Sequence, residues 1–274
     1  MLTYEQALQQ VLETVAPLAP VQHPLPEAVG LILAEAVPAH WDMPPCDNSA
    51  MDGFAIGDHP DTIQSPLDIV GTAYAGHPFS GVVATGQAVR ITTGAPLPAG
   101  ATSIVPLEDV IDQTTEVALK APVRPGQHVR RQGEEFRAGE LLLEAGTQLH
   151  AGEIGLLACA GVAQVLAPPR PRVAIISSGD ELVPLGETPG PGRIINSNLY
   201  FLMARVRECG GLPVPLGIGE DNPQVLDSLI VEGMKADLLI STGGVSVGEK
   251  DLMHMALTKQ GLSLIHISEP TRPY

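Results

Sequence analysis

From Arg172 onward, short apolar segments alternate with amphipathic ones, and this order limits the possible folds more than any other feature of the chain. The apolar segments, "VAIISS", "PVPLGIG" and "DLLIST", have the length of buried strands. The intervening segments, "LYFLMARVRECG" and "NPQVLDSLIVEGMKA", have the length of helices, and the first ends at Gly210. Strands that alternate with helices form a parallel sheet covered on both faces. We therefore expect residues 169–261 to form a three-layer α/β domain with a parallel sheet at its centre.

The region from Asp42 to Phe136 shows a different pattern. Short β-like runs such as "LDIVGTAY", "AVRITTGA", "TSIVPLEDV" and "TEVALKAPV" are separated by glycine and proline. Strands this short, with turn residues between them, are typical of a small all-β module. The pattern predicts a β-rich inserted domain over residues 42–136.

The segments on either side of this region favour helices. Residues 3–15 place their apolar side chains on one helical face, with Thr3 as N-cap and Pro17 beyond the end. "LPEAVGLILAEAV" indicates a helix or a buried segment, and "GTQLHAGEIGLLACAG" indicates a helix. Residues 1–41 and 137–168 are thus expected to form a linker or helical domain, which makes the chain a multidomain α+β protein with an N-terminal helical segment.

Charge and composition narrow the classes of function. The net charge of −16 argues against general nucleic-acid binding, which needs a basic face to displace counterions. The three cysteines are far apart and form no CxxC pair, which suits a reducing compartment. The longest apolar run, "IGLLACAGVA", is too short to span a bilayer. We expect a cytoplasmic protein without nucleic-acid or membrane partners.

Four loops combine small residues with carboxylates: "CDNSAMDGFA", "ISSGDELV", "GIGEDNP" and "STGGVSVGEKD". The last three each follow a predicted strand of the α/β domain. Because the carboxyl ends of parallel strands meet at one edge of a sheet, these loops should converge there.

Such an edge could bind a phosphorylated ligand. At Gly243 and Gly244, backbone N–H groups could approach a phosphate. Convergent carboxylates can hold Mg²⁺, which would offset the repulsion between an acidic chain and an anionic ligand. The alternative for each loop is ordinary turn and N-cap chemistry. "HVRRQGEEF" is likewise either a solvated mixed-charge loop or an anion clamp.

Five motifs resemble, in order and spacing, those of the molybdopterin molybdenumtransferase family, which includes MoeA and the E domain of gephyrin. They are "PPCDNSAMDGFA", "RITTGAPLPAGA", "RRQGEEFRAG", "VAIISSGDELV" and "STGGVSVGEKD". The resemblance extends from Met1 to about Gly261. It implies that residues 169–261 are an incomplete domain of the molybdopterin-binding type.

The resemblance implies an enzyme that inserts molybdate into adenylated molybdopterin, with Mg²⁺ present and AMP released. It implies a homodimer whose active cleft lies between the α/β domain of one subunit and the β-rich insert of its neighbour. Molybdopterin adenylyltransferase would be the upstream enzyme that supplies the pterin substrate.

The resemblance also assigns site residues. The expected catalytic residues are Asp52, Glu135, Glu181, Asp221 and Asp251. The last three of these are also the expected metal ligands. The expected substrate-binding residues are Ser178, Gly179, Thr242, Gly243, Gly244, Ser246, Gly248 and Lys250. Glu135 stands where the family commonly has aspartate, so its side chain reaches further.

The end of the chain departs from the family. Family members continue with a "KPGKP"-like lysine pair and a further β-rich domain, whereas here "LSLIHISEPTRPY" follows Gly261. That run resembles the translation of a sequencing adapter. We therefore expect residues 262–274 to be a non-native tail and the chain to have low or no turnover by itself.

Two alternatives to an insertase are open at this point. One is a non-catalytic molybdopterin-binding or scaffold module, which would be indifferent to substitution of Glu181 or Asp251. The other is a different Mg²⁺-dependent phosphoanhydride hydrolase, which would release AMP from ordinary dinucleotides.

Overall fold

The computed structural model describes residues 3–57, 66–220, 222–243 and 252–259. The chain forms two compact units. The first, here called the α/β unit, comprises Met1–His23, Ala28–Ala34 and Leu166–Tyr274. The second, the β-rich unit, comprises Pro24–Glu27 and Glu35–Val165. The finer division expected at residues 42, 137 and 169 stays a prediction.

The α/β unit is built on three parallel strands, as predicted. They are β13 (Arg172–Ser178), β16 (Leu212–Gly219) and β17 (Leu238–Thr242), in the order β16-β13-β17. The central strand β13 is buried from Val173 to Ser178 because it has a strand on each side and helices on both faces.

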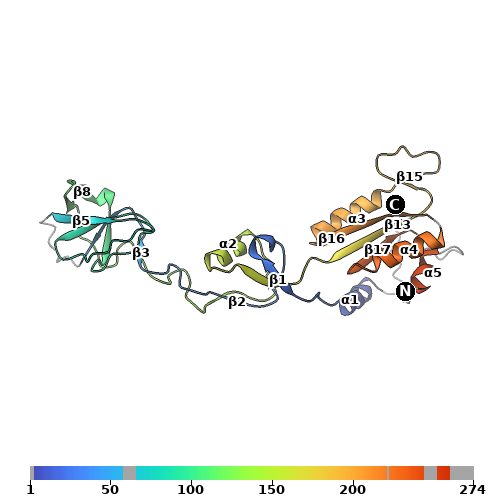
Figure 1. The fold of residues 1–274 in the computed structure, drawn as a ribbon, viewed down its shortest axis with the longest axis horizontal. Coiled ribbons are helices and arrows are strands. Elements are labelled where there is room, and N and C mark those ends of the chain that lie inside the picture. The colour runs from blue at the N-terminus through green and yellow to red at the C-terminus, as the bar shows by residue number, and fades with distance from the viewer. Residues whose placement is uncertain (1–2, 58–65, 221, 244–251, 260–274) are drawn as a thin grey trace. The chain divides into compact units, whose positions relative to one another are not determined.

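Helices cover both faces of this sheet (Figure 1). They are α3 (Ser197–Glu208), α4 (Pro223–Gly233) and α5 (Leu252–Lys259). Ile175 of β13 packs with Leu199 of α3, whereas the next residue, Ile176, packs with Ile230 of α4 and Met253 of α5. Successive strand residues point to opposite faces, so this alternation gives the three layers that the sequence predicts. A short parallel pair, β14 (Leu182–Val183) and β15 (Ile194–Ile195), lies between β13 and α3 in the sequence.

The predicted N-terminal helix is α1 (Tyr4–Thr14). Thr3 caps it: its hydroxyl accepts from Gln6 N, while the Gln6 side chain accepts from Thr3 N. This reciprocal capping box satisfies two backbone donors. Of the predicted apolar face, Ala7 is buried, and Leu8, Val11, Leu12 and Val15 are exposed.

The β-rich unit contains the predicted all-β module as one six-stranded sheet, in the order β7-β4-β6-β5-β9-β8. Its strands are β4 (Gly53–Ile56), β5 (Leu67–Ala73), β6 (Gln87–Ile91), β7 (Ser103–Pro106), β8 (Val110–Asp112) and β9 (Glu116–Leu119). Phe54 and Ile56 pack into one apolar cluster, and Ala55 packs into another. Both faces of β4 are therefore buried, and the protein as a whole is multidomain α+β.

The segment from Leu25 to Val37 is irregular and only partly buried. Only η1 (Leu25–Glu27) forms a short 3₁₀ turn, while Leu31 and Leu33 are buried in an irregular segment. Gly30 adopts a φ of 80°, a left-handed conformation that ends a helix. The helix that the sequence allowed here is therefore wrong, and the alternative of a buried segment holds in part, since Val29 and Ile32 are about half exposed.

The remaining elements are short. They are α2 (Ala151–Cys159), η2 (Leu107–Asp109), β1 (Val21–Pro24), β2 (Val37–Pro38), β3 (Asn48–Ser49), β10 (Val129–Arg130), β11 (Leu141–Leu143) and β12 (Gln164–Ala167). Helix α2 is the one predicted within "GTQLHAGEIGLLACAG". In the described part of the chain, every helix is too short or too polar to cross a membrane.

Replacement of Ile230 by alanine should destabilise the α/β unit. Ile230 is 0% exposed and packs between α4 and the sheet, so the variant loses apolar contacts and leaves a cavity. We expect the free energy of unfolding to fall by about 3 kcal/mol. Urea denaturation would measure it. The neighbouring residue on the same helix, Val231, is 47% exposed, and Val231→Ala should change that free energy by less than about 0.5 kcal/mol. Equal losses for the two variants would contradict this packing.

Candidate functional site

The ends of the three parallel strands lie side by side. In the sheet register, Ser178 at the end of β13 pairs with Gly219 at the end of β16. Ser177 pairs with Thr242 at the end of β17. The three loops rich in small and acidic residues therefore leave the sheet from the same edge. The helices that follow β13 and β17 lie on opposite faces of the sheet, an arrangement that opens a ligand crevice at the carboxyl ends of strands.

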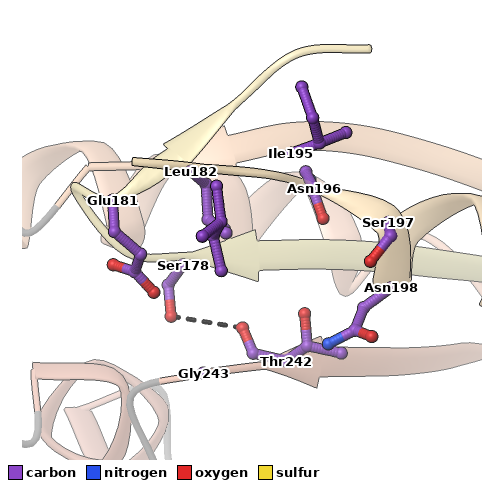
Figure 2. A pocket seen from close by; sticks show the side chains of 10 residues that line it. Ser178, Glu181, Leu182, Ile195, Asn196, Ser197, Asn198, Thr242 and Gly243 are labelled. Atoms are coloured by element: carbon purple, nitrogen blue, oxygen red, sulfur yellow. Dashed lines mark hydrogen bonds between the residues drawn. The ribbon is translucent and has the colours of Figure 1, made fainter. Parts of the chain in front are cut away.

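A pocket of about 120 Å³ opens at this edge (Figure 2). Four of the predicted site residues line it: Ser178, Glu181, Thr242 and Gly243. Its other lining residues are Leu182, Ile194, Ile195, Asn196, Ser197 and Asn198. The predicted residues thus meet those of β15 and the first turn of α3.

A second pocket, of about 350 Å³, lies on the same loop after β13. The predicted residue Gly179 lines it, together with Asp180, Arg193 and Glu220. Arg193 gives this pocket a cationic side chain beside two acidic ones.

Two of the predicted residues are glycines with a positive φ. Gly243 has a φ of 87°, and a Cβ atom there would lie 2.3 Å from the carbonyl oxygen of Ser178. Gly179 has a φ of 143°, and a Cβ atom there would lie 2.3 Å from Oε2 of Glu181. At Gly243 the neighbouring atom is fixed backbone, so only a residue without a side chain fits there. At Gly179 the neighbouring atom is the end of a flexible side chain, and it is the positive φ that favours glycine.

Hydroxyl and carboxylate oxygens supply the polar surface of the predicted part of the pocket. Ser178 Oγ donates to the carbonyl oxygen of Thr242 at 3.4 Å (Figure 2), and Thr242 Oγ1 donates to Ser177 Oγ at 3.2 Å. Glu181 lies exposed in a tight turn after β13. In this turn Leu182 N donates a hydrogen bond to Gly179 O at 3.2 Å. Oxygen donors of this kind are the ligands that Mg²⁺ prefers, so the chemistry of the pocket fits the expected ion.

Six of the predicted residues lie outside the described part of the chain. They are Asp221, Gly244, Ser246, Gly248, Lys250 and Asp251. Glu181 is thus the one expected metal ligand that the structure places. Within the described ranges, no three His, Cys, Asp or Glu side chains gather closely enough to hold a metal ion.

The sequence reasoning missed one wall of the pocket, from Ile194 to Asn198. Asn196 is the N-cap of α3, and its side chain accepts from Leu199 N. The signal was available, because asparagine directly before an amphipathic segment is a favoured N-cap. Because Asn196 begins α3 at the edge of the sheet, the residues around this cap line the pocket.

In the β-rich unit, Asp52 is held by Thr93. Its Oδ1 accepts from Thr93 N at 2.7 Å and from Thr93 Oγ1 at 2.9 Å. These hydrogen bonds lower the pKa of Asp52 below its ordinary value of 3.8, and the bond from Thr93 N has the larger effect. The carboxylate is therefore ionised at neutral pH.

The other predicted residue of this unit, Glu135, accepts from Arg130. Arg131 pairs with Asp47 at 2.6 Å, and Gln132 N donates to Asp47 at 2.8 Å. Those contacts lower the pKa of Asp47, and the hydrogen bond from Gln132 N has the largest effect. Because both arginines already have carboxylate partners, the structure favours a mixed-charge loop over an anion clamp.

These observations define a protein class: a multidomain protein with an α/β ligand site at a strand edge and a separate β-rich unit. The family model "MoeA N-terminal region (domain I and II)" matches residues 2–161, and "Probable molybdopterin binding domain" matches residues 174–270. The chain belongs to the MoeA family.

Relatives and solved structures agree with this assignment. The chain is 40% identical over 252 residues to a molybdopterin molybdenumtransferase of Nostoc sp., covering 90% of this chain and 58% of that protein. It is 37% identical over 262 residues to molybdopterin molybdenumtransferase 2 of Mycobacterium tuberculosis, covering 92% of this chain and 64% of the relative. The crystal structure of a molybdopterin biosynthesis MoeA protein from Pyrococcus horikoshii OT3 superposes with a TM-score of 0.78 at 29% identity, covering 89% of this chain and 66% of that one. The chain therefore spans roughly three-fifths of the length of these curated relatives.

The variant Gly243→Ala should disturb the strand edge. The new methyl group would meet the Ser178 carbonyl in a backbone conformation that alanine disfavours. We expect the free energy of unfolding of the α/β unit to fall by about 1–3 kcal/mol, measured by urea denaturation. Gly190→Ala is the control, since a Cβ atom there meets nothing within 4 Å at an ordinary φ. An equally small effect at both positions would show that Gly243 is not confined as described.

Thr93→Val should raise the pKa of Asp52 by removing the hydroxyl donor while leaving the backbone N–H. The depressed pKa stabilises the folded state above pH 3.8, and this contribution is lost as the pH falls through the folded-state value. The stability difference between the native protein and the variant should therefore shrink in acid below pH 3.8. Carboxyl NMR titration gives the pKa directly, and Thr93→Ser, which keeps the hydroxyl, should leave it low. An Asp52 pKa that is the same with valine and with serine would contradict the role of the hydroxyl.

Proposed function

We propose that this chain is part of a molybdenum insertase, an enzyme that inserts molybdate into adenylated molybdopterin and releases AMP. The observation that carries the proposal is the set of oxygen-bearing side chains and close-packed glycines at one strand edge, in a chain 40% identical to a molybdopterin molybdenumtransferase. The fold alone would not suffice, because similar sheets serve many reactions.

The pocket side chains have separate tasks in this proposal. Gly243 brings backbone against the edge of the sheet, where amide groups can face an anionic part of the pterin. Gly244, Ser246, Gly248 and Lys250, which lie outside the described residues, are proposed as further substrate-binding residues on the basis of the family motif. Ser178 and Thr242 orient the substrate through hydroxyl groups that can donate or accept. Gly179 leaves room for the carboxylate of Glu181, which a larger residue would displace.

The expected ion would be held by Glu181 with Asp221 and Asp251. Mg²⁺ at such a site neutralises phosphate charge and so favours cleavage of the phosphoanhydride. A cation there also answers an electrostatic difficulty, because a chain with a net charge of −16 otherwise repels an anionic substrate.

Asp52 and Glu135 are proposed as catalytic residues contributed by the β-rich unit. Asp52 is suited to accept a hydrogen bond or to hold a cation at neutral pH, because its pKa is lowered. We further propose a cytoplasmic homodimer, in which each cleft combines the α/β unit of one subunit with the β-rich unit of the other. Its pterin substrate would come from molybdopterin adenylyltransferase.

The test is AMP release from adenylated molybdopterin in the presence of molybdate, measured with the full-length gene product. Glu181→Gln should lower the rate at least about 100-fold, because the neutral amide binds a divalent cation poorly. Glu187→Gln is the matched control, since Glu187 is exposed farther along the same loop and does not line the pocket. It should keep the native rate. Unchanged turnover in Glu181→Gln would refute the catalytic assignment and favour a binding or scaffold module.

A further inference from the structure

Asn196 occupies an unusual position between the strand-edge pocket and α3. It lines the pocket although the residue is only 2% exposed. Its backbone N–H donates to Val183 O at 3.0 Å, which ties it to the short β14–β15 pair. The residue is thus fixed from both sides, by a strand before it and a helix after it.

The side chain of Asn196 is only half satisfied. Its Oδ1 accepts from Leu199 N at 3.3 Å and so caps α3. That bond sets the orientation of the amide and leaves Nδ2 as the remaining donor. Within the described part of the protein, Nδ2 is buried and meets no acceptor. A buried donor without a partner costs free energy, and such groups call for an explanation.

The first turn of α3 provides further donors at the same place. The N–H groups at the start of a helix have no partner within the helix, and the helix dipole adds partial positive charge there. Ser197 and Asn198 carry two of these groups, and both residues line the pocket. Figure 2 shows the side chain of Asn198 extending from this turn toward Thr242.

We propose that Nδ2 of Asn196 and the first turn of α3 bind a phosphoryl group of the substrate. A phosphoryl group offers several acceptor oxygens at once, which matches a buried amide donor beside a helix N-terminus. The pocket, at about 120 Å³, is well below the roughly 300–1,000 Å³ of whole-ligand pockets, so it suits one group of a larger molecule. The inference rests on the proposed function and assigns this pocket wall to phosphoryl binding.

The charges in the pocket divide it into two halves. Glu181 brings negative charge on the side of the β13 loop, whereas the α3 side offers donors and partial positive charge. An anionic group therefore binds on the α3 side. The phosphoanhydride of the proposed substrate contains two such groups: the phosphate of the pterin and the phosphate of the adenylate.

The test is the variant Asn196→Asp, in which the carboxylate keeps the cap but replaces the donor by a negative oxygen. Aspartate is a comparable N-cap. A carboxylate oxygen in this buried position costs stability, however, so the melting temperature should fall and is measured beside the affinity. Affinity for the phosphorylated ligand should fall about ten- to hundredfold, the range for a lost hydrogen bond to a charged group. Calorimetric titration of the full chain with AMP, and separately with molybdopterin, would measure it.

The two titrations identify the source of the phosphoryl group. Weaker binding of AMP alone assigns the adenylate phosphate, and weaker binding of molybdopterin alone assigns the pterin phosphate. The matched control is Gln164→Glu, the same exchange of a side-chain amide for a carboxylate at an exposed position of β12 in the β-rich unit. It should bind both ligands with native affinity.

Asn196→Gly separates loss of the donor from added negative charge. Glycine is tolerated at an N-cap, so this variant should fold and still bind about tenfold more weakly. Native affinity of Asn196→Asp and Asn196→Gly for both ligands would overturn the inference while leaving the insertase proposal intact. If the native protein binds neither ligand, the proposed function fails together with it.

Discussion

The parallel register of β13 with its two neighbours is the constraint on which the site depends. Because Ser178 pairs with Gly219, and Ser177 with Thr242, three separate loops begin within one row of the sheet. No single loop encloses the pocket. A shift of one residue between β13 and β17 would turn the side chains at the end of β17 to the opposite faces and separate the hydroxyl groups of Ser178 and Thr242. The geometry of the wall formed by Ser178, Thr242 and Gly243 is therefore a property of the sheet.

Periodic segments allowed most of the fold to be predicted from the sequence. The strands and helices after Arg172 are long, regular and strongly apolar, so their type and order follow from spacing alone. The segment after Leu25 was ambiguous for the opposite reason. It is apolar without a clear period. The positive φ of Gly30 interrupts any helix here, and that backbone conformation depends on tertiary structure.

Site residues could be predicted only where the residue types of a motif themselves indicate ligand binding. Ser178, Glu181 and Gly243 stand out because small and acidic residues follow a strand. Asn196 does not, because its importance comes from a half-satisfied amide, and hydrogen-bond partners of a cap are fixed by tertiary structure. The partner of Asp52 was hidden for a similar reason, since Thr93 lies 41 positions away in the sequence.

The burial of β13 has a consequence for how this site can move. The strand is covered on both faces and paired along both edges, so its amide groups have no local route to solvent. Their hydrogen exchange should require unfolding of the whole α/β unit, whereas the exposed turn at Glu181 can open by itself. The wall of the pocket formed by the end of β13 is thus as rigid as the core, whereas the wall formed by the turn at Glu181 can move. A ligand entering there would meet a fixed row of hydroxyl groups and a carboxylate that can close over it.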